Sequence, residues 1–468
     1  MTRLLDTARA FVAAMDDCKR DALDPHLGKP PPGHAYVEPG GCAPSDAIAV
    51  PVIRYRPPFS TALRHDARDD ARHLVFEALI SRGLDRPFLP QDAHALSRSF
   101  ADYYRDVLHT GYVPFREGVS EQLANTSASE WCKKINSLVS LFIRKIANGE
   151  VTVNEADDAA WNHSTSAVFA DKGKRNKQED RHLLVHDLSL WREPDQPKPE
   201  AGSQAAKTSF FAVFDGHGGS EVSAYAAAHM APAFVAAGGV ATEDCLRETF
   251  KIMDDRITAR IEKEGWKSGS TAVVLAADDN NIAMAWAGDS AILVLRAHEV
   301  ERLSFEHRPC NKSEHKRVED AGGYFIYFGG EERVNGIINI TRSLGDVGGR
   351  PMIIAEPDTM SIPRTMGEYL MIMCCDGVAD ELDDEDFYKR VCDYTRKHPV
   401  ENWAKLPADL VAAADAEGSQ DNMTCIVVYL RPPQDLWNLF KEAPDESDEE
   451  EEEVKENTGG SGDAKAAK

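Results

Sequence analysis

Aspartates stand at the ends of apolar segments in several distant parts of this sequence. The stretch FFAVFDGHGG, residues 210–219, runs from five apolar residues into Asp215, His217 and three glycines. The pattern recurs at three further apolar segments, 282–287, 369–375 and 423–430, which adjoin Asp289, Asp376 and Asp421. One Asp-Gly pair is usually a simple turn. Several such aspartates in one domain predict that they meet in one negatively charged pocket.

A pocket of this kind needs cations, because clustered carboxylates repel one another. Hard divalent cations prefer oxygen ligands, so we expect two Mg²⁺ or Mn²⁺ ions, which acidify a shared water for attack on phosphorus. Gly216 allows its own carbonyl to approach a metal. His217, two residues after Asp215, the acid expected to bridge the two ions, is placed to protonate a leaving oxygen. A purely structural histidine is the alternative.

An upstream basic segment, KGKRNKQED at residues 172–180, offers further groups for the same chemistry. Arg175 can hold a phosphate through two parallel hydrogen bonds. Glu179 and Asp180 add carboxylates within this basic stretch. A solvated surface loop is the simpler interpretation of the segment taken alone.

The elements that must position these residues change in type along the chain. Residues 1–158 are predicted to form a mostly helical domain, interrupted by a Pro-rich segment at 24–60. Its clearest helix is 127–148, which begins with the capping box SASE and has apolar residues at helical spacing. Such helical faces usually pack a core, and a partner-binding surface is the alternative.

Residues 159–440 are predicted to form the domain that carries the aspartates. Short strands of high β propensity are predicted at 210–214, 272–276, 282–287, 291–296, 369–375 and 423–430. Helices are predicted at 219–237 and 246–263, and DDNN at 278–281 indicates a hairpin. Antiparallel neighbours with separate helices indicate an α+β fold, in which the helices cover the outer faces of the sheets.

Composition and charge exclude several classes of function. The formal net charge of −25 argues against binding to nucleic acid or to anionic lipid, and no apolar run is long enough to predict a membrane helix. The nine cysteines form no CxxC pair, which predicts reduced thiols and a cytoplasmic or nuclear location. The acidic tail, residues 441–468, is predicted to be disordered, and Ser447 within it is a candidate site for an acid-directed kinase.

Nine blocks in order resemble the metal-dependent type 2C serine/threonine protein phosphatases, over roughly residues 160–432. They are RNKQEDR (175–181), FAVFDGHGG (211–219), SGSTA (268–272), WAGDS (286–290), EHRP (306–309), EDAGG (319–323), RVNGIINITRSLGD (333–346), CDGVAD (375–380) and SQDNMT (419–424). The resemblance implies a four-layer α-β-β-α sandwich, with two antiparallel sheets between helix layers and two metal ions at one end.

The resemblance also implies a role for each matching residue. The implied metal ligands are Asp215, which bridges both ions, the Gly216 carbonyl, Asp376 and Asp421. Glu179 and Asp180 are implied to hold metal-bound waters or to contact the metal ligands from behind, and Asp289 to lie near a third, weaker ion. Supporting positions are Thr271, Asp380 and Asn422. Arg175 is implied to bind the substrate phosphate, and His217 to be the general acid.

The sequence departs from the family pattern in a few places. Ala379 stands where a tryptophan is common, Gln178 where a methionine is usual, and Arg308 replaces the lysine of a His-Lys-Pro block. No ligand is lost, so these changes are expected to affect substrate preference only. Residues 311–333 should form the variable flap beside the cleft.

One branch of the family is especially similar. It contains the feminisation phosphatase of animal sex determination and the phosphatases that act on calmodulin-dependent kinases. The resemblance implies phosphoprotein substrates, a place in sex determination or kinase signalling, and protein partners bound through residues 1–158. The alternative is a scaffold that acts through N-terminal protein binding, with catalysis secondary.

Overall fold

The protein is described by a computed structural model, which covers residues 5–12, 59–80, 90–116, 119, 121–153, 165–192 and 208–441. Most of the predicted Pro-rich segment, all but the first residue of the acidic tail, and Ser447 lie outside these described residues. Among the residues described, no helix combines the length and apolar character that crossing a membrane requires.

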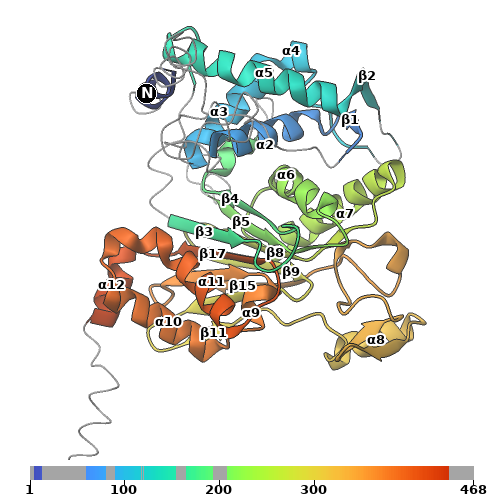
Figure 1. The fold of residues 1–468 in the computed structure, drawn as a ribbon, viewed down its shortest axis with the longest axis vertical. Helices are drawn as coiled ribbons and strands as arrows, with labels where there is room; N and C mark the ends of the chain where they lie inside the picture. The colour runs from blue at the N-terminus through green and yellow to red at the C-terminus, as the bar shows by residue number, and fades with distance from the viewer. Residues whose placement is uncertain are drawn as a thin grey trace, which may run out of the picture.

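Two five-stranded antiparallel sheets form the centre of the molecule (Figure 1). The first has the order β11-β10-β16-β17-β3, with strands Val300–Arg302, Ala291–Leu295, Leu370–Cys374, Met423–Tyr429 and Thr165–Asp171. The second has the order β15-β9-β8-β5-β4, with strands Asp358–Pro363, Asn281–Ala287, Ala272–Ala277, Ser209–Phe214 and Arg181–Val185. All neighbouring strands within the two sheets are antiparallel, as the sequence predicted.

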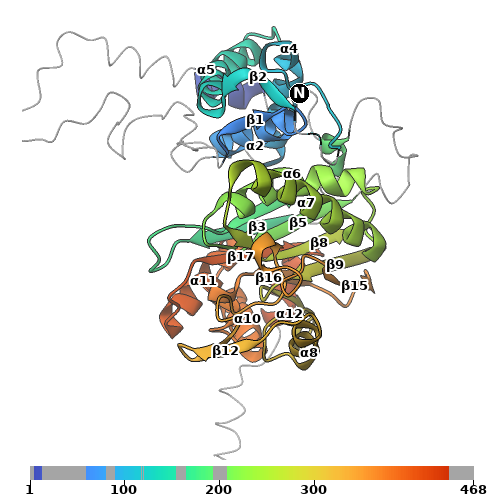
Figure 2. The same ribbon diagram turned by 90° about the vertical axis from the view of Figure 1, so that its right-hand side faces the viewer.

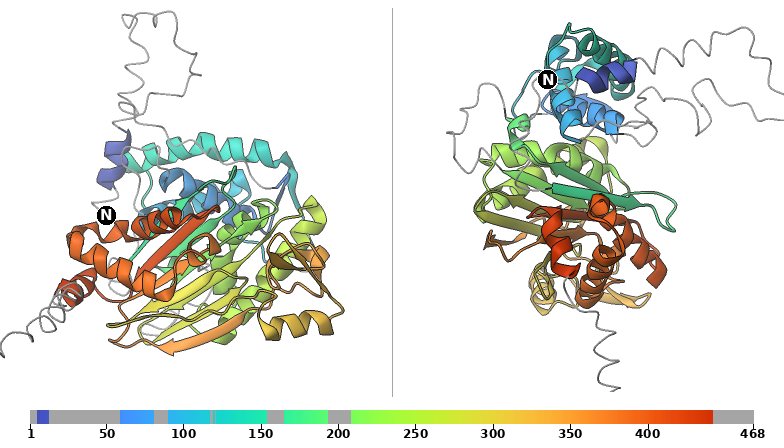
Figure 3. Two further views of the ribbon diagram at one scale, coloured as in Figure 1. Left: turned by 60° about the horizontal axis from the view of Figure 1, so that its bottom comes forward. Right: turned by 90° about the vertical axis from the view of Figure 1, so that its left-hand side faces the viewer.

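Helices cover the outer face of each sheet, which gives the predicted four layers (Figures 1 and 3). Helices α6 (Glu221–Ala236) and α7 (Glu243–Glu264) pack on the second sheet. Helices α10 (Asp384–Lys397), α11 (Leu406–Glu417) and α12 (Pro433–Lys441) lie on the side of the first. Short helical turns are α9 (Asp376–Ala379), η2 (Leu188–Trp191), η4 (Val347–Gly349) and η5 (Val400–Lys405).

Strand β5 shows why the central strands have apolar runs without alternation. Phe211 and Val213 pack into the core between the two sheets. Phe210, Ala212 and Phe214 belong to the core on the opposite face, beneath α6 and α7. Because both faces of the strand are buried, nearly every position must be apolar.

The N-terminal region packs directly on α6, and Figure 2 shows it stacked on that side of the sandwich. Residues 5–12 are helical. The other elements are β1 (Thr61–Leu63), α2 (Ala67–Ile80), α3 (Pro90–Tyr103), α4 (Arg105–Leu108), β2 (Gln122–Ser127) and α5 (Ala128–Ala147). One hydrophobic cluster contains Leu74 of α2, Trp131 of α5 and Phe234 of α6. The two predicted domains therefore share a core across the predicted boundary.

Buried ion pairs and hydrogen bonds reinforce this contact between the start of α2 and helices α6 and α7. The Asp66 carboxylate, fully buried just before α2, accepts hydrogen bonds from Tyr225 Oη at 2.9 Å, from Arg256 Nη2 at 3.1 Å and from Arg260 Nε at 2.8 Å. Burial alone would raise the pKa of Asp66, but Arg260, His229 and Arg256 outweigh it and lower the pKa. The N-terminal region is thus held by charged groups that are almost completely buried.

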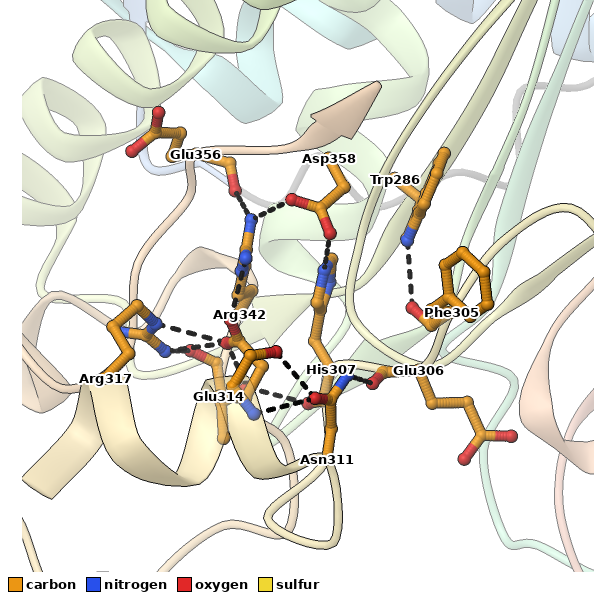
Figure 4. A network of polar contacts seen from close by, with 12 residues as sticks. Trp286, Phe305, Glu306, His307, Asn311, Glu314, Arg317, Arg342, Glu356 and Asp358 are labelled. Carbon is orange, nitrogen blue, oxygen red and sulfur yellow. Dashed lines mark hydrogen bonds and ion pairs between the residues drawn. The ribbon is translucent and has the colours of Figure 1, made fainter. Parts of the chain in front are cut away.

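A small lobe beside the sandwich contains α8 (Lys312–Asp320), β12 (Phe325–Phe328) and β13 (Glu331–Val334), within the predicted flap. Its helix is anchored by Glu314, which accepts hydrogen bonds from Arg317, Thr341 and Arg342 (Figure 4). Burial would raise the pKa of Glu314, but these three donors lower it to about 2. Arg342 also contacts Asp358 of β15, which joins the lobe to the second sheet.

Candidate metal centre

The antiparallel pairings bring the predicted acids to one end of the sandwich. Asp215 follows β5 directly, and Asp376 lies just beyond the end of β16. Cys374 at the end of β16 pairs with Cys425 near the start of β17, so Asp421, just before β17, lies beside Asp376. Asp289 lies in the turn between β9 and β10. Residues remote in sequence therefore converge, as the strand-end pattern predicted.

A cleft of about 1230 Å³ opens at this end of the sandwich. It is lined by eleven of the twelve predicted site residues, namely Arg175, Glu179, Asp215, Gly216, His217, Thr271, Asp289, Asp376, Asp380, Asp421 and Asn422. The remaining one, Asp180, is only 3% exposed and accepts a hydrogen bond from Thr424 Oγ1 at 2.7 Å. No predicted site residue lies on a separate surface.

The carboxylates of the cleft repel one another strongly. Burial, and then the charges of Asp376, Asp180 and Asp289, raise the pKa of Asp215 well above its usual range. Burial, together with nearby Asp289, raises the pKa of Asp376 to about 8. Burial raises the pKa of Asp180 to about 6. Burial and mutual repulsion cause these shifts, and a cation bound among the carboxylates would relieve the repulsion.

Two carboxylate oxygens in this group have no hydrogen-bond partner among the described residues. They are Oδ1 of Asp180 and Oδ1 of Asp376, and both are buried. An unpaired buried oxygen is costly, and a hard divalent cation is the ligand that such an oxygen set accepts. The residues present therefore fit the metal ions that the sequence predicted.

The loop that carries Glu179 is held by Asn422. Its Oδ1 accepts the backbone N–H of Glu179 at 2.8 Å, and its Nδ2 donates to the carbonyls of Lys172 and Lys177, each at 2.9 Å. Gly216 is required at its position, because a Cβ there would lie 2.5 Å from the carbonyl oxygen of Glu179. The sequence predicted Asn422 and Gly216 as site residues, and these contacts show what each does in the fold.

The two side chains predicted to act on the substrate both lie at the cleft. Arg175 has a side chain 59% exposed and pairs with Asp421. His217, on β6 (Gly216–His217), is 30% exposed and lies with its Nε2 2.7 Å from Asp346 Oδ2. Thr271 is buried, and its Oγ1 accepts the backbone N–H of Asp215 at 3.3 Å.

Arg308 is a site residue that the sequence analysis missed. Its Nε lies 2.7 Å from Asp289 Oδ2, and its Nη2 lies 2.8 Å from Asp380 Oδ2 and 3.5 Å from Asp376 Oδ2. The replacement of lysine by arginine in the EHRP block was visible, but it was expected to affect substrate preference only. The structure instead places this guanidinium among the carboxylates of the predicted third metal position.

Cys375 also lies close to the acids, within 4.8 Å of ligand atoms of Asp180 and Asp215. Burial raises the pKa of its thiol well above the usual value. Its Sγ accepts the backbone N–H of Thr424 at 3.0 Å and donates to the Asn422 carbonyl at 3.3 Å. A cysteine that binds a metal must be a thiolate, whereas this thiol keeps its proton and donates it to a backbone carbonyl. Cys375 therefore has a structural role beside the acids.

The comparisons with known proteins agree with this geometry. The family profile described as "Protein phosphatase 2C" matches residues 166–423. "Protein phosphatase fem-2" of Caenorhabditis elegans is 35% identical over 409 residues, which cover 86% of this chain and 87% of that protein. A solved structure described as "Structure of a C.elegans sex determining protein" superposes with a TM-score of 0.71 at 33% identity, over 81% of this chain and 91% of that chain.

Mammalian relatives match a shorter part of the chain. Mouse "Protein phosphatase 1E" is 30% identical over 280 residues, and human "Protein phosphatase 1F" is 31% identical over 272 residues. These matches cover 59% and 58% of this chain, and 36% and 58% of the relatives' own lengths. The N-terminal region is thus included in the nematode match, and the mammalian matches span about the length of the sandwich.

Proposed function

Because the chain belongs to the protein phosphatase 2C family, and is a serine/threonine phosphatase of that family, we propose that phosphoserine and phosphothreonine are hydrolysed in the cleft at the strand ends. One observation carries the proposal: acids from five separate parts of the chain meet there, and two buried oxygens among them, on Asp180 and Asp376, have no hydrogen-bond partner in the described part of the chain. Such a set is unfavourable without cations and matches the oxygen ligands of Mg²⁺ or Mn²⁺.

Different residues of the cleft bind the metal ions and the substrate phosphate. Divalent cations, when bound, neutralise phosphate charge and make water acidic enough to attack at neutral pH. Asp215, Asp376, Asp421 and the Gly216 carbonyl would hold two such ions. The exposed guanidinium of Arg175 binds phosphate oxygens in a fork.

Proton transfer and positioning complete the proposed reaction. His217 lines the cleft together with Asp215 and gives a proton to the departing serine or threonine oxygen. Glu179 and Asp180 orient water through their carboxylates. Thr271 and Asn422 fix the backbone around Asp215 and Glu179, so the protein contributes mainly position and charge.

The number and identity of the ions form the finer part of the proposal. We infer two Mn²⁺ or Mg²⁺ ions at the buried acids and a weaker third near Asp289 and Asp380. Arg308 already pairs with both of these acids. A third ion must therefore displace a guanidinium, which explains why this position would be the weakest of the three.

The substitution Asp215→Asn tests the proposal directly. It removes the acid that faces Asp376, Asp180 and Asp289, so Mn²⁺-dependent hydrolysis of a phosphothreonine peptide should fall by about a hundredfold or more. Asp320→Asn, an exposed acid on α8, is the matched control and should leave turnover unchanged. Chelation with EDTA should stop the wild-type reaction, and Mn²⁺ or Mg²⁺ should restore it. Wild-type turnover in Asp215→Asn would refute the assignment.

The biological setting is proposed from the relatives. The solved C. elegans structure described as that of a sex determining protein covers 81% of this chain, so we propose a role in that kind of pathway, with phosphoproteins as substrates in the cytoplasm or nucleus. Protein partners would bind the N-terminal region, where Tyr103, Val107, Tyr112 and Leu141 are exposed. Deleting residues 1–158 would not test this cleanly, because that region shares a core with α6. Serine substitutions at the exposed positions, with activity and partner capture measured separately, are the better experiment.

A further inference from the structure

We propose that Asp346 is the residue that positions His217 for proton transfer, so that the two side chains act as a pair. The inference rests on the proposed role of His217 as proton donor. Asp346 ends the RVNGIINITRSLGD block, 129 residues after His217 in the chain. In space its Oδ2 lies 2.7 Å from His217 Nε2, and both residues line the cleft.

A separate small sheet brings the two residues together. Strand β7 (Gly269–Ser270) lies between β6, which ends at His217, and β14 (Leu344–Gly345), which Asp346 follows. His217 pairs with Gly269 on one side, and Gly345 pairs with the same Gly269 on the other. The histidine and the carboxylate therefore approach each other across one residue of the middle strand.

Gly269, the residue between them on the middle strand, has no side chain, and His217 and Asp346 occupy the space that a side chain would fill. A Cβ at Gly269 would lie 2.1 Å from Asp346 Oδ2 and 2.4 Å from His217 Nε2. Both distances are far below any van der Waals contact. The histidine–aspartate bond therefore occupies the volume that any other residue at position 269 would fill.

The backbone and a second donor fix the carboxylate in place. Asp346 has φ 45° and ψ 37°, a left-handed conformation that aspartate and asparagine tolerate better than most residues. Its Oδ2 also accepts a hydrogen bond from Ser343 Oγ at 2.6 Å. The side chain is 16% exposed. A carboxylate held in this way can fix the orientation of the imidazole ring.

This contact decides which nitrogen of His217 can serve the substrate. A carboxylate only accepts hydrogen bonds, so the hydrogen between the residues belongs to Nε2. The proton for the leaving group then comes from Nδ1. When the P–O bond breaks, its electron pair stays on the serine or threonine oxygen, which takes this proton. Water supplies the new oxygen on phosphorus and loses a proton to solvent, while His217 keeps Nε2–H on Asp346.

The test uses two substrates that differ in their need for a proton. An alkyl leaving group, as in a phosphothreonine peptide, needs protonation, whereas the nitrophenolate of p-nitrophenyl phosphate leaves without it. Asp346→Asn keeps the shape and tolerates the left-handed backbone. We expect it to lower kcat for the peptide by about 10- to 100-fold and kcat for the aryl ester by less than about threefold. His217→Gln should show the same dependence on the leaving group.

Further variants separate positioning from folding. The double variant Asp346→Asn/His217→Gln should be no slower than His217→Gln alone, since the aspartate acts only through the histidine. Ser343→Ala should give a smaller loss with the same substrate dependence. Mn²⁺ affinity by calorimetry should be unchanged in Asp346→Asn, and Asp320→Asn is the matched control.

Several results would overturn the inference. Equal losses of kcat for both substrates, weakened Mn²⁺ binding or additive effects in the double variant would make Asp346 a structural residue. If His217→Gln shows no dependence on the leaving group, the role of His217 is wrong and the pair has no function. A wild-type protein without metal-dependent turnover would instead refute the proposed phosphatase site.

Discussion

Removing the buried carboxylate of Asp66 should unfold the N-terminal region and the sandwich together at a lower denaturant concentration. Asp66 is fully buried and is the shared partner of Arg256 and Arg260, which are 7% and 0% exposed. In Asp66→Ala both guanidinium groups stay buried with less compensation. Breaking a buried ion pair costs about 3–5 kcal/mol.

We expect a cost at the lower end of that range, because Arg256 and Arg260 keep some of their other partners in Asp66→Ala. Arg260 keeps the Thr61 carbonyl at 2.8 Å and Glu264 at 3.3 Å, and Arg256 keeps Asp69 at 3.6 Å. We therefore expect the free energy of unfolding to fall by about 3 kcal/mol. Lys316→Ala removes the exposed pair with Asp320 and is the control, for which no measurable loss is expected because exposed ion pairs contribute little.

Urea denaturation followed by tryptophan fluorescence and by residual activity is the assay, with Mn²⁺ held constant. Because the two regions share one core, both signals should move to lower urea together. A loss below about 1 kcal/mol, or fluorescence that changes while activity persists, would refute the argument.

The contribution of Asp66 to the free energy of unfolding should also depend on pH, and it should decrease in acid. Its pKa is lowered in the folded protein, so its stabilising effect is fully present above the unfolded value of about 3.9. The effect is lost as pH falls from there toward the folded pKa. The difference in unfolding free energy between the wild type and Asp66→Ala should therefore shrink as the pH falls below about 4.

Three further predictions concern the cleft and its flap. Arg308→Ala should raise Mn²⁺ affinity at the weakest site by about tenfold in calorimetry, since the guanidinium no longer competes for Asp289 and Asp380; unchanged affinity would contradict this competition. Tyr327 and Ile337 line the cleft and are 71% and 76% exposed, so they can contact a bound protein substrate. In Tyr327→Ser/Ile337→Ser the KM should rise several-fold for a phosphoprotein and stay constant for p-nitrophenyl phosphate. Equal changes in KM for the two substrates would count against this docking role. Glu314→Gln should lower the free energy of unfolding of the flap by about 2 kcal/mol, measured by hydrogen exchange in α8, because the amide replaces a carboxylate held by Arg317 and Arg342; protection equal to wild type would show the network to be dispensable.

The sequence predicted the central elements well because their burial leaves a strong signal. The strand predicted at 423–430 is Met423–Tyr429, and the helix predicted at 127–148 is Ala128–Ala147, with the Ser127–Glu130 capping box formed. Strands β3, β4 and β15 were missed, because each lies at the edge of a sheet and mixes polar with apolar residues. Their pairing depends on a neighbouring strand, which a local pattern does not show.

The sequence predicted the acids that gather in the cleft. It did not predict the charged side chains that pair with the site residues. Asp215, Asp376 and Asp421 could be found because each follows or precedes an apolar segment that must be a strand. Arg308 and Asp346 stand in polar segments, and their roles depend on contacts across 68 and 129 residues. The buried network at Asp66 was missed for the same reason, since its arginines lie on α7, far along the chain.

Anomalous X-ray diffraction from crystals grown with Mn²⁺ would locate the ions at the proposed site. We expect two strong manganese peaks in the cleft, between the carboxylates of Asp215, Asp376 and Asp421, with a weaker peak near Asp289 at high Mn²⁺ concentration. Manganese bound elsewhere, or a cleft that stays empty at saturating Mn²⁺, would contradict the proposed site.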